Sequence, residues 1–240
     1  MRCYCYETDA AFFFCVEDVK NAKLEAAIQH MAWRKTGEKF VVPYSQNAFS
    51  NQGEKERIGS NFSRLGQAMF ASPLSGFDWR KPLEMLAQKF NENEIEWYIV
   101  GSVGDAIRGA DVKPFDMDIV VHTRDYCKAK DVCYHSFPDS VIAPFAEKEE
   151  INPLRYFGRL FLAGAMIEVA ADETWNLESR QQGFGGFPAQ ISKYEKTSWN
   201  GHDVYLESLQ LRYQIEKARN RKDRVKALKK CFKRTKGPKN

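Results

Sequence analysis

Apolar residues follow two spacings along this chain, one typical of strands and one typical of helices. The segment AFFFCVEDV, residues 11–19, is strand-like. In residues 21–37, NAKLEAAIQHMAWRKTG, apolar residues recur at helical spacing, so the pattern predicts a helix that ends at Gly37. The next stretch, SQNAFSNQGEKERIGSN over residues 45–61, is polar and predicts a loop.

The pattern over residues 77–172 predicts the elements of one sheet. DWRKPLEMLAQKFNENE predicts a helix with Asp78 as its N-cap, and IEWYIV predicts an apolar strand that ends at Gly101. VGDAIRG then predicts a short helix, and DMDIVV predicts a second strand. YFGRLFLAGAMIEVA predicts a hairpin that turns near Ala163 and Gly164. Strand, helix, strand and hairpin in this order predict an α+β fold, with a mixed β-sheet flanked by helices.

The last part of the chain predicts a loop, a strand and a basic helix. QQGFGGFP is rich in glycine and predicts a loop, and DVYLESL predicts a strand. An apolar stripe runs through LQLRYQIEKARNRKDRVKALKKCF and predicts one long C-terminal helix. The final residues, CFKRTKGPKN over 231–240, predict a disordered basic tail.

Composition narrows the class of protein. The chain is 43% hydrophobic and 28% charged, which is typical of a globular protein, and no run approaches the roughly 18 apolar residues of a membrane helix. AAFFFCV is too short for a signal peptide, so we expect a cytoplasmic protein without a membrane partner. Residues 212–240 hold 13 Lys or Arg against two acids, although the net charge of the chain is only +4. This uneven charge indicates a phosphate-rich partner or a solvated basic helix face.

Two acids stand in the strand DMDIVV, where packing alone does not require them. Side chains alternate across a strand, so Asp116 and Asp118 point to one face. Their mutual repulsion is relieved by a cation, and a hard divalent ion such as Mg²⁺ takes oxygen ligands and accepts substrate phosphates. Upstream, the Gly-Ser turn that leads into a helix offers backbone N–H groups suited to phosphate oxygens. Glu168 is the expected third carboxylate, and Asp172 is the alternative. These parts together predict a site for metal-assisted phosphoryl or nucleotidyl transfer.

The string VGSVGDAIRG followed by FDMDIVV resembles the signature of nucleotidyltransferases of the DNA polymerase beta superfamily. Within that superfamily the chain most resembles the small bacterial aminoglycoside and lincosamide nucleotidyltransferases, through WNGHDVYLESL and the basic RNRKDRVKAL. The resemblance covers residues 77–230, which it marks as a nucleotidyltransferase domain. It leaves residues 1–76 as an additional N-terminal α/β region of unknown role.

The resemblance implies a Mg²⁺-dependent enzyme that moves an NMP, with AMP the expected case, from an NTP to an acceptor hydroxyl and releases pyrophosphate. It implies one or two Mg²⁺ ions held by Asp116 and Asp118, with Glu168 as a further metal ligand or as the base. The residues it implies for nucleotide binding are Gly101, Ser102, Arg108, Lys222 and Arg224. For the last three, a solvated or helix-end cation is an equally good interpretation.

The acceptor is not fixed by these motifs. A small molecule is the favoured acceptor, and RNA, a tRNA end or a protein are the alternatives, because all of them need the same metal site. A toxin–antitoxin component that acts by binding is the non-enzymatic alternative. Asp105 is expected to face away from the triphosphate, because a carboxylate beside phosphates is unfavourable. The N-terminal region is also a candidate for a partner or homodimer contact.

Overall fold

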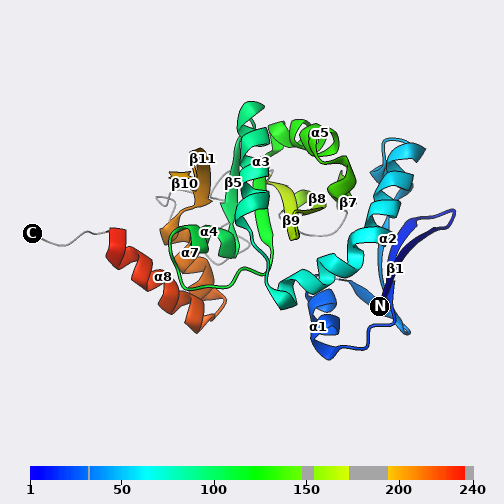
Figure 1. Ribbon diagram of the computed structural model, residues 1–240, viewed down its shortest axis with the longest axis horizontal. Helices are drawn as coiled ribbons and strands as arrows, with labels where there is room; N and C mark the ends of the chain where they lie inside the picture. The colour runs from blue at the N-terminus through cyan, green and yellow to red at the C-terminus, as the bar shows by residue number, and fades with distance from the viewer. Residues whose placement is uncertain (32, 148–153, 173–193, 236–240) are drawn as a thin grey trace, which may run out of the picture.

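The computed structural model describes residues 1–31, 33–147, 154–172 and 194–235, and these residues form two sheets connected by one long helix (Figure 1). The N-terminal sheet is antiparallel, with its described strands in the order β1-β2-β4-β3. Its strands are β1 (Arg2–Glu7), β2 (Phe12–Glu17), β3 (Arg34–Thr36) and β4 (Lys39–Tyr44).

The main sheet is built from the later part of the chain. Its described strands are β5 (Trp97–Val100), β6 (Met117–His122), β7 (Val141–Glu147), β8 (Leu154–Leu162), β9 (Ala165–Asp172), β10 (Tyr194–Trp199) and β11 (His202–Glu207). They lie in the order β10-β11-β5-β6-β9-β8-β7. Strands β11 and β5 run parallel, as do β6 and β9, and the other neighbours run antiparallel. The prediction of an α+β fold with a mixed sheet is confirmed.

Helices flank this sheet, two of them where the periodicity predicts a helix and one, α5 (Tyr126–Ser136), in a stretch for which no element was predicted. The helix α3 (Arg80–Glu92) packs against β11 and α5, and α5 also packs against β6 and β7. The short helix α4 (Gly101–Ile107) follows β5 directly. Asp78 accepts a hydrogen bond from the backbone N–H of Arg80 at 3.1 Å, although α3 itself begins after Trp79. Short 3-10 turns complete the connections at η1 (Gln46–Ala48), η2 (Thr123–Asp125) and η3 (Pro138–Ser140).

The N-terminal region differs from its prediction in two places. Helix α1 (Ala22–His30) ends before the expected Gly37, because the following residues pair as the hairpin β3–β4 and Gly37 lies in its turn. Helix α2 (Gln52–Ser75) occupies most of the stretch predicted as a loop. Asn51 caps α2 by accepting a hydrogen bond from the N–H of Glu54. The buried face of the helix holds polar residues and glycines, such as Lys55, Gly59 and Asn61, beside Ile58 and Phe62, so the sequence shows no clear apolar period.

Helix α2 ties the two sheets into one core. It packs against β1 of the N-terminal sheet and against β7 of the main sheet. The amide of the buried Asn61 donates hydrogen bonds to the carbonyls of Pro138 at 2.8 Å and Val141 at 3.0 Å, just before and at the start of β7. One continuous cluster of buried apolar side chains runs through both sheets, so residues 1–76 pack as an integral part of the molecule.

The C-terminal segment forms two helices where one was predicted. Helix α7 (Leu209–Ala218) and helix α8 (Lys222–Thr235) pack against each other, and the chain turns between them at Asn220, which has φ +54°. Helix α8 also includes the first residues of the predicted disordered tail, because Cys231 and Phe232 pack against α7. The α7–α8 pair and the N-terminal sheet lie at opposite ends of the molecule (Figure 1).

The glycine-rich QQGFGGFP falls outside the described residues. Among the helices that the structure describes, none combines the length and the apolar character needed to cross a bilayer.

Substitution of two glycines on α2 tests how closely this helix packs. A Cβ at Gly66 would lie 2.7 Å from Sγ of Cys3, so Gly66→Ala should lower the free energy of unfolding by about 1–3 kcal/mol. Gly53→Ala is the matched control, because the nearest atom to its Cβ lies 3.4 Å away. We expect the control to leave stability unchanged or slightly higher. Urea unfolding measures both, and equal effects would contradict the close contact of α2 with β1.

Candidate active site

Strand β5, helix α4 and strand β6 meet at a point that requires a glycine. Val100, the last residue of β5, pairs with Asp118 on β6, and Gly101 follows with φ +76°. A Cβ at Gly101 would lie only 2.9 Å from Oδ2 of Asp118. Both the backbone conformation and the close carboxylate therefore exclude a larger residue, and the first turn of α4 lies directly beside Asp118.

The two acids of this strand are held close to a third. Asp116 directly precedes β6, and Asp118 lies within it. Asp118 also pairs in register with Glu168 on the parallel strand β9, so these two side chains share one face of the sheet. Burial, followed by the negative charges of Asp116 and Glu168, raises the pKa of Asp118 well above its usual range. The fold therefore concentrates negative charge that a bound cation would neutralise.

Glu168 has a cationic partner of its own. Arg159 lies opposite Glu168 on the antiparallel strand β8 and is buried. Its Nε donates a hydrogen bond to Oε1 of Glu168 at 3.0 Å, and a second guanidinium nitrogen contacts the same oxygen. The charge of Glu168 thus raises the pKa of Arg159, although burial opposes this shift. Arg159 fixes the orientation of the Glu168 carboxylate.

A pocket of about 620 Å³ opens in front of the carboxylate pair. It is lined by residues from distant parts of the chain, namely Lys23, Ala26, Ala27, Leu74, Gly101, Ser102, Phe115, Asp116, Asp118, Arg212, Arg219, Arg221 and Arg224. The structure thus brings together five of the eight residues that the sequence proposes for the site. The five are Gly101, Ser102, Asp116, Asp118 and Arg224.

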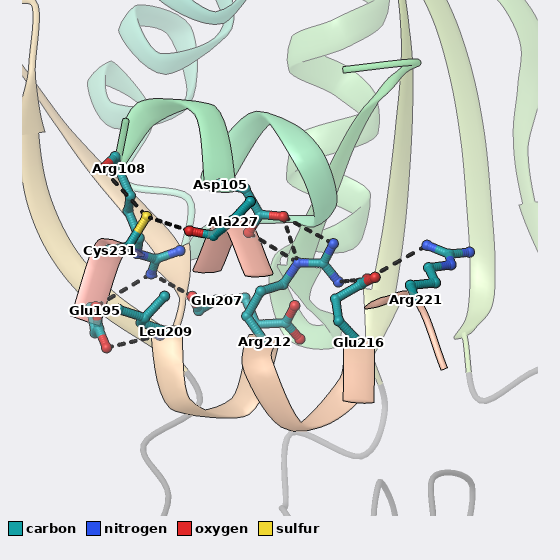
Figure 2. A network of polar contacts seen from close by, with 10 residues as sticks. All are labelled: Asp105, Arg108, Glu195, Glu207, Leu209, Arg212, Glu216, Arg221, Ala227 and Cys231. Atoms are coloured by element: carbon teal, nitrogen blue, oxygen red, sulfur yellow. Dashed lines mark hydrogen bonds and ion pairs between the residues drawn. The ribbon is translucent and has the colours of Figure 1, made fainter. Parts of the chain in front are cut away.

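The other three proposed residues lie outside the lining of this pocket. The guanidinium of Arg108 points to the far side of α4, where it contacts Glu195 at 3.3 Å and donates a hydrogen bond to the carbonyl of Glu207 (Figure 2). Lys222 is exposed at the start of α8. Glu168 lies beside Asp118 but is engaged with Arg159. The roles proposed for these three residues remain predictions.

Two arginines of the pocket, Arg212 and Arg221, contact buried acids, as Figure 2 shows. Asp105, on α4, is fully buried and accepts hydrogen bonds from Nε of Arg212 at 3.1 Å and from a second guanidinium nitrogen at 3.1 Å. Glu216 contacts the other side of the same guanidinium at 2.6 Å and Arg221 at 3.5 Å. Asp105 is thus directed at α7 and does not line the pocket. The network fixes α7 against α4 and positions Arg212 and Arg221 at the pocket.

Two further arginines indicate that this side of the pocket is suited to an anion. Burial, together with the neighbouring charge of Arg221, lowers the pKa of Arg219. One guanidinium nitrogen of Arg224 is buried without a hydrogen-bond partner among the described residues. An anion in the pocket would stabilise the charge of Arg219 and would accept a hydrogen bond from the unpartnered nitrogen of Arg224.

Four cationic residues of the pocket lie outside the Gly-Ser and Asp-x-Asp motif and were not predicted from the sequence. Arg212, Arg219 and Arg221 lie in the segment whose basic charge indicated a phosphate-rich partner or a solvated helix face, but none of the three was singled out. The requirement for a cationic partner of Asp105 becomes visible only when the fold buries this carboxylate and places Arg212 of α7 beside it. Lys23 carried no local signal either.

The residues present fit a Mg²⁺ ion brought with a nucleotide. Within the described residues, no group of three His, Cys, Asp or Glu side chains is arranged to hold a metal ion. Mg²⁺, however, keeps several waters and commonly uses one or two carboxylates together with substrate phosphates. Asp116 and Asp118 supply such a pair, and the raised pKa of Asp118 reflects the charge that the ion would offset.

No protein-family profile and no curated protein match this chain. It is similar to several solved structures. A candidate nucleotidyltransferase from Thermotoga maritima is 21% identical with a TM-score of 0.43, over 64% of this chain and 92% of its own. An antigenic nucleotidyltransferase-like protein from Paracoccidioides brasiliensis is 16% identical with a TM-score of 0.40, over 62% and 74%. The lincosamide antibiotic adenylyltransferase LnuA, solved with lincomycin bound, is 13% identical with a TM-score of 0.43, over 62% and 95%.

Neutralising Asp118 should stabilise the protein when divalent cations are absent. Asp118→Asn removes a charge that burial and neighbouring acids make costly, so we expect the melting temperature to rise by about 2–4 °C at pH 7. Because the folded-state pKa is raised, the cost exists only when Asp118 is ionised, and the difference from wild type should shrink as the pH is lowered toward the ordinary pKa of an aspartate.

Thermal unfolding across pH measures this difference. Asp111→Asn is the matched control, since Asp111 is exposed in the loop before β6. It should leave the melting temperature unchanged. A lower melting temperature for Asp118→Asn would mean that the carboxylate stabilises the fold.

Proposed function

We propose that this chain is a nucleotidyltransferase that moves an NMP, AMP in the simplest case, from an NTP to the hydroxyl of a small-molecule acceptor. One observation carries the proposal: Asp116 and Asp118 line the same pocket as the Gly101-Ser102 turn and four arginines. Carboxylates and arginines in one pocket suit a substrate that brings a divalent cation and phosphates together. The raised pKa of Asp118 supports this pairing.

The arginine side would bind the phosphates. Arginine is well suited to phosphate oxygens because its planar guanidinium donates paired hydrogen bonds. Arg212 is held in place by Asp105 and Glu216, so it is oriented before a ligand arrives. At Gly101 a side chain would meet Asp118, and its absence leaves room for phosphate oxygens beside the backbone N–H groups at the start of α4, with Mg²⁺ between them and the carboxylate.

The carboxylates would place the reacting phosphate. Mg²⁺ held by Asp116 and Asp118 would offset negative charge on the phosphates and on the oxygens that enter and leave the α-phosphorus. In the reaction, the acceptor oxygen forms a bond to the α-phosphorus while the bond to the bridging oxygen of pyrophosphate breaks. The acceptor proton must leave at the same time. Glu168 is the carboxylate next to Asp118 that could take it, with Arg159 fixing its orientation.

A nucleotide panel tests the proposal directly. Purified protein with Mg²⁺ and each of the four ribonucleoside triphosphates should release pyrophosphate in the presence of hydroxyl-bearing acceptors, and mass spectrometry should detect the acceptor with one added NMP. Asp116→Asn should reduce the rate by at least about 100-fold, because it removes half of the carboxylate pair.

The control for this experiment is Asp111→Asn, which changes an exposed carboxylate of the neighbouring loop and should retain full activity. Pyrophosphate release that is equal in wild type and Asp116→Asn would contradict the proposal. Failure of any NTP to bind in the presence of saturating Mg²⁺ would contradict it more strongly.

Glu168→Gln separates proton transfer from binding. If Glu168 takes the acceptor proton, the variant should lower kcat by about 100-fold or more and leave the KM for the NTP nearly unchanged. Steady-state kinetics over a range of NTP concentrations measures both constants. A kcat equal to that of wild type would assign the proton to solvent, because Asp172, the alternative from the sequence, pairs with His122 at the far end of β6.

A further inference from the structure

One side of the pocket comes from the N-terminal region, which the catalytic motif does not include. Helix α1 contributes Lys23, Ala26 and Ala27, and the last turn of α2 contributes Leu74. We call these residues the N-terminal wall. In Figure 1, α1 lies to one side of the ends of β5 and β6, and the α7–α8 pair with its arginines lies to the other. The carboxylate pair therefore has an arginine side and an N-terminal side.

In-line phosphoryl transfer requires the acceptor and the leaving pyrophosphate to occupy different sides of the pocket. The entering and leaving oxygens must lie on opposite sides of the α-phosphorus. If the arginines bind the pyrophosphate portion of the NTP, the acceptor must approach from the side away from them. The N-terminal wall lies on that side.

The chemistry of the N-terminal wall is apolar with one cation. Leu74 is 40% exposed and is one of two large hydrophobic residues that the structure shows as exposed, the other being Tyr6. Ala26 and Ala27 have small side chains that leave space in front of them. Lys23 is exposed and has no ion-pair partner among the described residues. An apolar surface beside an uncompensated ammonium suits a ligand that has an apolar group and an anionic group.

The charges in the whole pocket lining also favour an anionic acceptor over a cationic one. Its lining contains five cationic side chains and only two acids, Asp116 and Asp118, which the proposed function reserves for the metal ion. A polyamine acceptor would find no further carboxylate in this described lining and would lie next to Lys23. Like charges at such distances weaken binding, so the lining disfavours a polycation.

We propose, on the basis of the nucleotidyltransferase function above, that the N-terminal wall is the acceptor site. It binds an acceptor with an apolar group and a carboxylate or other anionic group in addition to its hydroxyl. Lys23 binds the anionic group, and Leu74 packs against the apolar group. Residues 1–76 thereby determine which acceptor the enzyme uses.

Two fluorescent probes of opposite charge test this site without knowledge of the natural acceptor. Dansylglycine carries a carboxylate and dansylcadaverine carries an amine on the same apolar fluorophore. We expect wild-type protein, with and without a non-hydrolysable ATP analogue and Mg²⁺, to bind dansylglycine about tenfold more tightly than dansylcadaverine. Lys23→Glu should remove this preference, and Leu74→Ser should weaken both probes by about tenfold.

The matched control is Lys20→Glu, which makes the same charge change at an exposed residue outside the pocket lining. It should keep the preference for dansylglycine. All three variants should bind the ATP analogue as wild type does, which also shows that they are folded. Tighter binding of dansylcadaverine by wild type, or equal loss of dansylglycine binding in Lys20→Glu and Lys23→Glu, would overturn the proposal.

Nucleotide binding separates this proposal from the one on which it rests. If Lys23→Glu lost affinity for the ATP analogue as well as for dansylglycine, the N-terminal wall would belong to the nucleotide site and the acceptor assignment would be wrong. If wild type failed to bind the ATP analogue but kept a Lys23-dependent preference for dansylglycine, the nucleotidyltransferase function would fail and an anion-binding wall would remain.

Discussion

Repulsion between carboxylates at the start of β6 is the constraint on which the site depends. Asp118 is placed beside Asp116 and in register with Glu168, and burial adds to the cost of its charge. A strand that served only packing would be more stable without this arrangement. The surrounding backbone nevertheless maintains it, since Gly101 leaves room for the Asp118 carboxylate where any side chain would collide with it. The geometry is explained if a cation and its phosphates share the pocket.

A second set of charges is arranged in the opposite way, with the buried acids Asp105 and Glu216 each matched to an arginine. Asp105 and Glu216 are fully buried and both contact Arg212, which joins α4 to α7 (Figure 2). These ion pairs fix α7 against α4 and also orient Arg212 and Arg221, which line the pocket. The protein therefore uses charge in two ways: buried ion pairs support the fold, and the pocket brings the carboxylates of Asp116 and Asp118 together with arginines.

The sequence predicted the parts of the site that depend on neighbouring residues. The two-residue period places Asp116 and Asp118 on one face, and the strand before Gly101 is apolar throughout, so both features could be recognised locally. Helix α2 was missed because its buried face carries polar residues and glycines among the apolar ones, and its packing against two sheets leaves no local pattern. The pairing of Asp105 with Arg212 spans 107 residues, and no local pattern reports such a contact. The contribution of Lys23 likewise depends on how the N-terminal region packs.

The central claim is that Asp116 and Asp118 bind a divalent cation together with a nucleotide. Electron paramagnetic resonance of Mn²⁺, titrated with wild type and with Asp118→Asn in the presence of a non-hydrolysable ATP analogue, measures this directly. Free Mn²⁺ gives a strong signal that falls when the ion is bound by the protein. Our account predicts about one or two ions bound per chain of wild type, in addition to those held by the analogue alone, and at least a tenfold weaker affinity in the variant. Equal Mn²⁺ binding by the two proteins would contradict it.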